Sequence, residues 1–92
     1  MNLKEHTERI CSLLEHSSYE EEAESIQDMY YKVEHLETNH AERISALENL
    51  ISRCHPRWLG DYYIAGLSYQ EWTNLIASFK KKLLKEIKRS RN

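Results

Sequence analysis

Residues that break helices are scarce in this chain. Its 92 residues include only two glycines and one proline. A sandwich or barrel of short strands needs many tight turns, and such turns depend on these residue types. With 40% hydrophobic and 30% charged residues, the composition is that of a folded domain rather than a linker. We therefore predict an all-α fold, an antiparallel helical bundle that residues 1–92 form as a single domain.

Two amphipathic segments fill the first half of the chain. Residues 3–16 place apolar side chains at helical spacing and predict a short first helix. Ser18 and Glu21 fit a capping box, in which each side chain binds a backbone N–H, so they predict the start of a second helix. From there, seam positions recur in steps of four and three at Tyr19, Ala23, Ile26, Tyr30, Val33, Glu37, His40, Ile44, Leu47, Ile51 and Cys54.

This regular seam favours one long central helix over residues 19–54. No glycine or proline interrupts it, and its phase continues throughout. The alternative is a hairpin with a break near residues 38–40, where Asn39 and Glu42 could form a second capping box. If the helix is continuous, the short first helix and the last helix could together cover it from end to end. So long a seam also leaves surface for a second copy, which makes a homodimer a further expectation.

The second half of the chain predicts a short helix followed by a long basic one. Pro56 ends the preceding helix and suits the first turn of a new one, which we expect over residues 56–65. Ser68 and Glu71 form the clearest capping box in the sequence. This box predicts a last helix that runs to about Arg89.

The net charge of −2 conceals two oppositely charged halves. Residues 1–52 carry four basic and twelve acidic side chains, whereas residues 53–92 carry nine basic and three acidic ones. Such asymmetry indicates either a charged partner or attraction between the halves. The chain has no apolar run of the roughly 20 residues that a membrane span requires, and its start lacks the apolar stretch of a signal peptide. We expect a cytoplasmic protein with no membrane partner.

Two surfaces are candidates for binding another protein. The connector after residue 55 concentrates Trp, Tyr and Arg, the residue types enriched at interface hot spots. Its candidate binding residues are Arg57, Trp58, Tyr62 and Tyr63. The acidic start of the second helix supplies Glu20, Glu21 and Glu24. Each set also has a structural interpretation, because the connector rings could plug the end of the bundle and the glutamates could complement the helix dipole.

The basic end of the last helix supports an alternative function. Phosphate binding requires clustered positive charge, and this helix supplies it with Lys81, Lys85, Lys88 and Arg89. No aromatic residues are interleaved there for stacking on bases. The same charges could instead complement the helix dipole or attract the acidic half of the chain.

One segment carries a motif-level similarity. Between His55 and Trp72 lie the pair Pro56-Arg57, an aromatic-Ile-x-Gly-Leu-Ser run that starts at Tyr63, and a glutamate at residue 71. This segment, about a fifth of the chain, resembles region 4 of sigma factors and related phage helix-turn-helix regulators. The resemblance implies DNA binding, with Gly-Leu-Ser opening a supporting helix and a second helix entering the major groove. The sequence departs from the family after Asn74, because no glycine turn precedes the lysine run.

Catalytic and metal-binding patterns are weak. Histidine and cysteine occur five and two times, but not at the paired spacing of a zinc site. The chain has no glycine-rich phosphate loop and no nucleophile with a base at an assignable spacing. Arg9 and His16 resemble the Arg-x4–6-His element of the all-helical HEPN ribonucleases, which implies RNA cleavage, but the polar residue usually beside the arginine is missing. We expect no enzyme activity, metal site or cofactor.

These observations favour a small non-enzymatic protein that binds a partner protein. Small size and a lack of catalytic motifs are typical of antitoxins, immunity proteins and phage-encoded inhibitors, which act by occupying a partner. A nucleic-acid-binding regulator that uses the basic last helix is the alternative.

Overall fold

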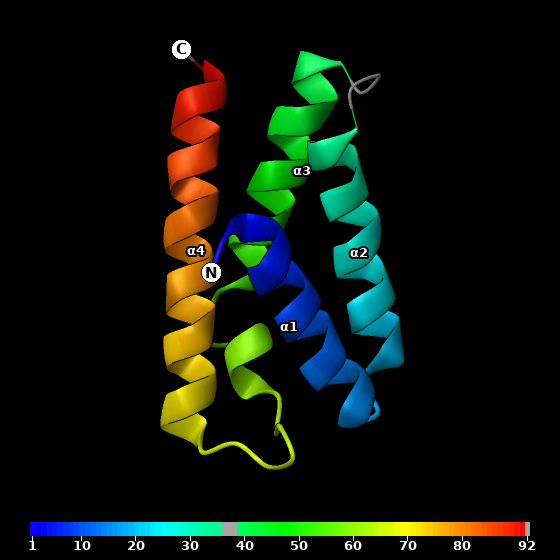
Figure 1. Ribbon diagram of the computed structural model, residues 1–92, viewed down its shortest axis with the longest axis vertical. Coiled ribbons are helices and arrows are strands. Elements are labelled where there is room, and N and C mark those ends of the chain that lie inside the picture. Colours follow the sequence, from blue (N-terminus) through cyan, green and yellow to red (C-terminus); the bar gives the residue numbers. More distant parts are fainter. Residues whose placement is uncertain (36–38, 92) are drawn as a thin grey trace.

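Four α-helices form the protein in the computed structural model, which describes residues 1–35 and 39–91 (Figure 1). They are α1 (Leu3–His16), α2 (Glu20–Glu34), α3 (His40–Arg53) and α4 (Tyr69–Arg91), and a 3-10 helix, η1 (Leu59–Asp61), lies between α3 and α4. No strand occurs within these described ranges, so the predicted all-α class is confirmed. No helix in this part of the chain combines the length and apolar character needed to cross a membrane.

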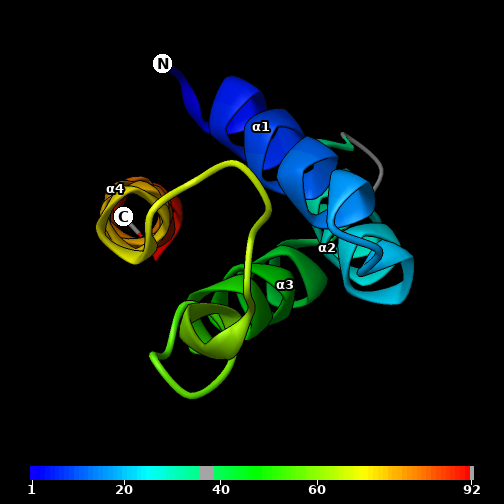
Figure 2. The same ribbon diagram turned by 90° about the horizontal axis from the view of Figure 1, so that it is seen from below.

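The helices form an antiparallel bundle. α1 packs against α2, α2 against α3, α3 against α4, and α4 against α1. Successive helices run in opposite directions in Figure 1, and Figure 2 shows them at the four corners of a quadrilateral. The connector from α3 to α4 crosses the end of the bundle where α1 and α3 finish and where α2 and α4 begin. We call this end the lower end, as it is drawn in Figure 1.

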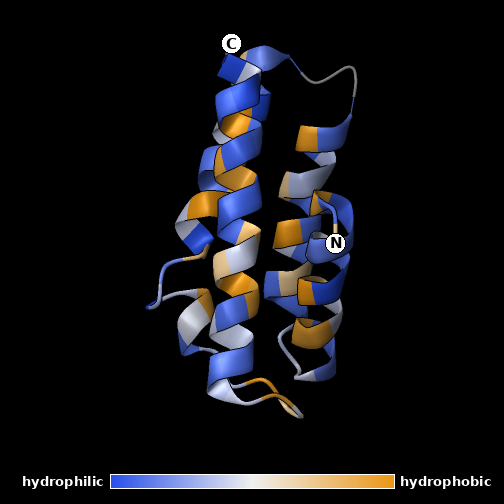
Figure 3. Ribbon diagram, turned by 60° about the vertical axis from the view of Figure 1, so that its left-hand side comes forward, coloured by the Kyte–Doolittle hydropathy of each residue, from blue (hydrophilic) through white to orange (hydrophobic). Residues whose placement is uncertain are grey.

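The core follows the apolar positions that recur at helical spacing along each helix. In Figure 3, hydrophobic and hydrophilic residues alternate along the helices. One continuous cluster joins the four helices and the connector. Its largest side chains, each less than 2% exposed, include Trp72, Phe79, Ile10, Leu14, Ile26, Leu47, Leu50, Leu59 and Leu83.

The single long helix over residues 19–54 is wrong. α2 ends at Glu34 and α3 begins at His40, so the chain turns back as in the alternative hairpin. Glu37, a polar position of the predicted seam, lies outside the described residues. The two halves of the seam pack against each other, and α1 and α4 do not lie end to end along one central helix.

Local hydrogen bonds close the hairpin between α2 and α3. The Asn39 side chain accepts from the Glu42 N–H at 2.8 Å and caps α3. The return contact of the predicted box joins the two side chains instead of reaching the Asn39 backbone, with Nδ2 3.0 Å from Glu42 Oε1. The Arg43 guanidinium donates to the carbonyl oxygens of Val33 and His35, each at 3.1 Å. These bonds satisfy polar groups that the break would otherwise leave without partners.

The two remaining predicted capping boxes have different outcomes. At α4, the Glu71 N–H donates to Ser68 Oγ at 3.1 Å and the Ser68 N–H donates to the Glu71 carboxylate at 3.2 Å, which confirms that box. The box at Ser18 and Glu21 is wrong, because Tyr19 occupies the N-cap position without a side-chain bond. Ser18 precedes the cap with a φ of 70°, and this left-handed backbone reverses the chain between α1 and α2.

The predicted helix over residues 56–65 is also wrong. Only the short turn η1 forms there, and the backbone becomes extended at Tyr62. Leu59 and Ile64 are both buried in the core. The departure from helical geometry after η1 lets both side chains reach the core, although residues five apart point in different directions on an α-helix. The Trp72 indole N–H donates to the Leu59 carbonyl oxygen at 2.7 Å and holds the connector against α4.

α1 and α4 differ in length, and this difference shapes the end of the bundle that lies opposite the lower end. α1 has 14 residues and α4 has 23. At about 1.5 Å per residue they extend about 21 and about 34 Å. α1 begins part-way up the bundle, and a groove of about 810 Å³ lies beside its first residues.

Candidate functional site

A buried ion pair organises the lower end of the bundle. Arg53, the last residue of α3, binds Glu22 in the first turn of α2, with Nη1 2.5 Å from Oε2. The two side chains are only 9% and 11% exposed. The other guanidinium nitrogens donate to Ser25 Oγ at 2.6 Å and to Asn49 Oδ1 at 2.7 Å. Every nitrogen of the guanidinium therefore has a partner, as a buried charge requires.

Two aromatic residues of the connector bind the same carboxylate. The Trp58 indole N–H and the Tyr62 hydroxyl each donate to Glu22 Oε1 at 3.1 Å. The Arg53 guanidinium lies 4.9 Å from the centre of the Trp58 ring, and Tyr19 stacks on Tyr62 with ring centres 4.5 Å apart. Burial, together with the hydrogen bond to Glu22, raises the pKa of Tyr62. Trp58 and Tyr62, two of the predicted binding residues, thus hold the connector to the helices.

Tyr63 is placed differently from its neighbours. Its side chain is 77% exposed. The Tyr62 hydroxyl is bonded on one side, and Ile64 is buried on the other. The Ala65 N–H then donates to Ser17 Oγ at 3.1 Å. The connector therefore holds the Tyr63 ring in solvent between fixed points.

The acidic candidates lie beside the connector. Glu20 and Glu21 line a depression of about 500 Å³ together with Tyr62 and Arg53. Glu24 is exposed farther along α2 and is not among the described residues of that lining. The structure thus joins most of the acidic and aromatic candidates at one end of the bundle. We define the lower-end surface as its exposed residues Glu20, Glu21, Arg57, Trp58 and Tyr63.

The central pair of this cluster was not predicted from the sequence. Glu22 and Arg53 each immediately precede a seam position, Ala23 and Cys54. The sequence signal for this pair was a charged residue beside the seam on each of the two segments. Pairing them requires the hairpin between α2 and α3, which a continuous helix excludes.

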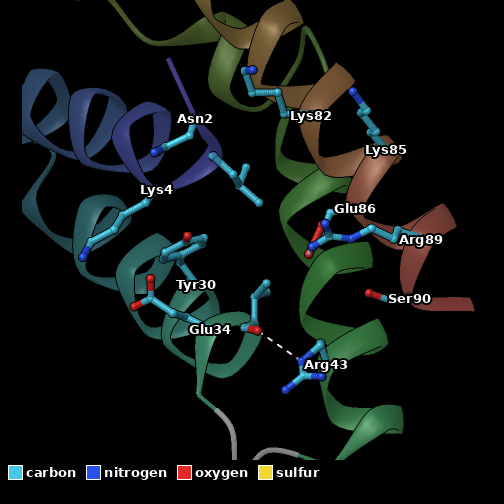
Figure 4. A pocket seen from close by; sticks show the side chains of 12 residues that line it. Asn2, Lys4, Tyr30, Glu34, Arg43, Lys82, Lys85, Glu86, Arg89 and Ser90 are labelled. Atoms are coloured by element: carbon cyan, nitrogen blue, oxygen red, sulfur yellow. Dashed lines mark hydrogen bonds and ion pairs between the residues drawn. The ribbon is translucent and has the colours of Figure 1, made fainter.

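The predicted basic face of α4 is divided between two surfaces. Lys85 and Arg89 line the groove beside α1, together with Lys82 (Figure 4). Lys81 and Lys88 are exposed but lie outside the described lining of the groove. The four predicted nucleic-acid-binding residues therefore do not share a single concave site.

The cysteine thiols are poorly suited to chemistry. Cys11 and Cys54 are free and buried, and burial raises the pKa of each to about 12. The nucleophilic thiolate is therefore scarce at neutral pH. No group of three metal-ligating side chains converges within the described part of the chain. Arg9 and His16 are both exposed on α1, where His16 Nδ1 lies 2.7 Å from the Ser12 carbonyl oxygen.

His6 is a buried titratable group in α1. Its side chain is 5% exposed and stacks on Phe79 with ring centres 6.4 Å apart. Its Nδ1 has no hydrogen-bond partner among the described residues. Burial, and then the positive charges of Lys82 and the N-terminus, lower the pKa of His6 below its usual 6.5, while Asn2 and Glu5 oppose this more weakly. The neutral ring is therefore favoured in the folded protein.

The lowered pKa of His6 should make the fold less stable in mild acid. The unfolded chain binds the proton more readily, so the free energy of unfolding should fall as the pH drops through 6.5 and level off below the folded-state pKa. His6→Leu should remove this contribution and stabilise the protein by about 1 kcal/mol at neutral pH, because the unpaired nitrogen is lost. Urea unfolding at about pH 7.5 and about pH 5 measures both effects, with exposed His40→Gln as the control. An unchanged pH dependence in His6→Leu would contradict this assignment.

The segment that resembles sigma-factor region 4 contains η1 and the start of α4. α4 continues without interruption from Tyr69 to Arg91, so no separate second helix follows, in line with the departure after Asn74. The chain matches no protein-family model, no curated protein and no solved structure.

Proposed function

We propose that the protein is a small non-enzymatic regulator that binds a partner protein through the lower-end surface. The fixed presentation of Tyr63 supports this proposal. Its ring is 77% exposed on a backbone that is anchored at both sides, so binding would cost little conformational entropy. Trp58, 37% exposed, lies on the same connector, and Tyr, Trp and Arg are the residue types that dominate binding hot spots.

The charges around these rings would select the partner. Glu20 and Glu21 are exposed at the start of α2, and Glu22 beside them is neutralised by Arg53. An acidic rim favours a partner with a basic surface and accelerates its encounter. In the manner of acidic inhibitors and immunity proteins, the protein would act by occupying that surface, and no chemical step is needed.

Removing the Tyr63 ring tests this function. Tyr63→Ala should weaken binding of the partner by at least about 2 kcal/mol, roughly 30-fold, while the melting temperature stays near that of the wild type. The wild-type protein and the variant would each be used to capture partners from an extract of the native host. The amounts of each captured partner would then be compared. Tyr31→Ala is the matched control, since Tyr31 is 61% exposed on α2. If the folded Tyr63 variant retains every partner at wild-type affinity, the lower-end surface is not the binding site.

A nucleic-acid-binding regulator is the second candidate, supported by the exposed lysines of α4. Binding through phosphates should weaken steeply as salt rises, whereas an interface centred on Tyr63 should change little. Replacing Lys81, Lys85 and Lys88 with glutamine and measuring binding to duplex DNA and RNA separates the two candidates. If the protein binds neither DNA nor RNA, or if the substitutions leave that binding unchanged, the nucleic-acid-binding function is eliminated.

A further inference from the structure

The groove beside α1 is an incomplete part of the bundle. α4 is nine residues longer than α1, which corresponds to about 14 Å of helix. Along this length α2 and α4 flank the groove and α3 lies behind it (Figure 4). Leu3, Tyr30 and Val33 line it with partly buried apolar side chains. The groove therefore offers apolar contact to one face of an additional helix.

Positive charge predominates around this groove. It is lined by two acidic residues, Glu34 and Glu86, and by five basic ones, Lys4, Arg43, Lys82, Lys85 and Arg89. Arg43 already binds carbonyl oxygens at the end of α2, and Arg89 pairs with Glu86 at 2.8 Å. Lys82 and Lys85 take part in no ion pair within the described residues. Their charges are available to an acidic occupant.

An acidic stripe of suitable length lies on an exposed face of α2. It consists of Glu21, Glu24 and Asp28, at helical spacings of three and four. The stripe spans about 10 Å along the helix axis, which is less than the length of about 14 Å by which α4 exceeds α1. None of its three carboxylates forms an ion pair with another described residue.

We propose that the groove binds the acidic stripe on α2 of a second copy of this chain, so that the protein self-associates. The carboxylates of the stripe would pair with Lys82 and Lys85, and the apolar side of the groove would be covered. A net charge of only −2 opposes this contact weakly. The groove and the stripe are different surfaces, so the contact is heterologous. The stripe shares Glu21 with the lower-end surface, but Tyr63 takes no part in self-association. The test below changes neither Glu21 nor Tyr63, so a failure of self-association is distinguishable from a failure of partner binding.

Nucleic acid fits the groove less well than a carboxylate-bearing helix. Lys81 and Lys88, which a phosphate-binding helix would use, lie outside the described lining.

Charge exchange between the two surfaces tests the proposal. The wild-type sedimentation coefficient should rise with protein concentration. A groove variant, Lys82→Glu with Lys85→Glu, and a stripe variant, Glu24→Lys with Asp28→Lys, should each raise the dissociation constant at least about tenfold through like-charge repulsion. An equimolar mixture of the two variants should restore association, because each altered surface then meets its complement. The matched control, Lys81→Glu with Lys88→Glu, makes the same charge change outside the groove and should associate like the wild type.

Several results would overturn the proposal. These are a wild-type protein that stays monomeric up to about 1 mM, association that the groove variant leaves unchanged, and a variant mixture that stays monomeric. Duplex DNA binding by a monomeric wild-type protein, lost in the groove variant, would assign the groove to nucleic acid instead. Circular dichroism checks that each variant is folded. A misfolded groove variant would be replaced by Lys82→Gln with Lys85→Gln, which should weaken association in the same direction.

Discussion

Glu22→Ala should lower the free energy of unfolding by about 3 kcal/mol, because it leaves a buried arginine without its counter-ion. Arg53 is 9% exposed, and Trp58 and Tyr62 would lose the oxygen that accepts both of their hydrogen bonds. Urea unfolding at neutral pH measures the change. Glu21→Ala is the matched control, since Glu21 is the exposed neighbour and should alter stability by no more than about 0.5 kcal/mol.

A double variant distinguishes a buried unpaired charge from a general loss of packing. Glu22→Leu with Arg53→Met removes both charges and keeps apolar volume, so it should be less destabilised than Glu22→Leu alone. The difference in the free energy of unfolding between the single and the double variant is the cost of leaving the Arg53 guanidinium unpaired. Equal losses in the single and double variants, or a Glu22→Ala protein as stable as the wild type, would show that the ion pair does not organise the lower end.

Trp72→Ala should destabilise the protein by about 3–5 kcal/mol, through loss of buried surface and the cavity that remains. Trp72 is 1% exposed and joins α4 to the connector. A domain of this size has a total stability of about 5–14 kcal/mol, so this one change would remove a large part of it. Thermal unfolding followed by circular dichroism measures the effect. Trp58→Ala is the control: that ring is 37% exposed, and its loss should cost less.

The milder Trp72→Phe separates packing from hydrogen bonding. It keeps an aromatic ring in the core but leaves the Leu59 carbonyl oxygen without its donor at 2.7 Å. Amide hydrogen exchange should then accelerate in η1 more than in α2 or α3. Uniform acceleration in all elements would show that this bond does not specifically anchor the connector.

Local signals predicted α1 and α4 well, because each helix has one apolar face and α4 also begins at a capping box. α1 covers residues 3–16 as predicted, and Ser68 with Glu71 marks the start of α4. The central segment failed, because helical phase alone does not tell a continuous helix from two helices that fold together. The decisive contribution to the stability of the hairpin is the burial of α2 against α3, which depends on residues far apart in the sequence.

The candidate site was predicted only in part, for the same reason. Residue type identified Tyr63 and Arg57, and both are exposed. Residue type could not show that Trp58 and Tyr62 bind Glu22, because these contacts join residues 36 and 40 positions apart. The groove likewise depends on helix packing that periodicity does not reveal.

The sequence by itself determined the helical class, because scarce glycine and proline and a strong 3.6-residue periodicity act locally. It also determined the opposite charges of its two halves. The tertiary structure decided where the chain turns, which charges are buried as pairs, and which aromatic ring stays in solvent. Those outcomes depend on desolvation and packing between distant segments, whose free energies exceed the small differences in local helix propensity.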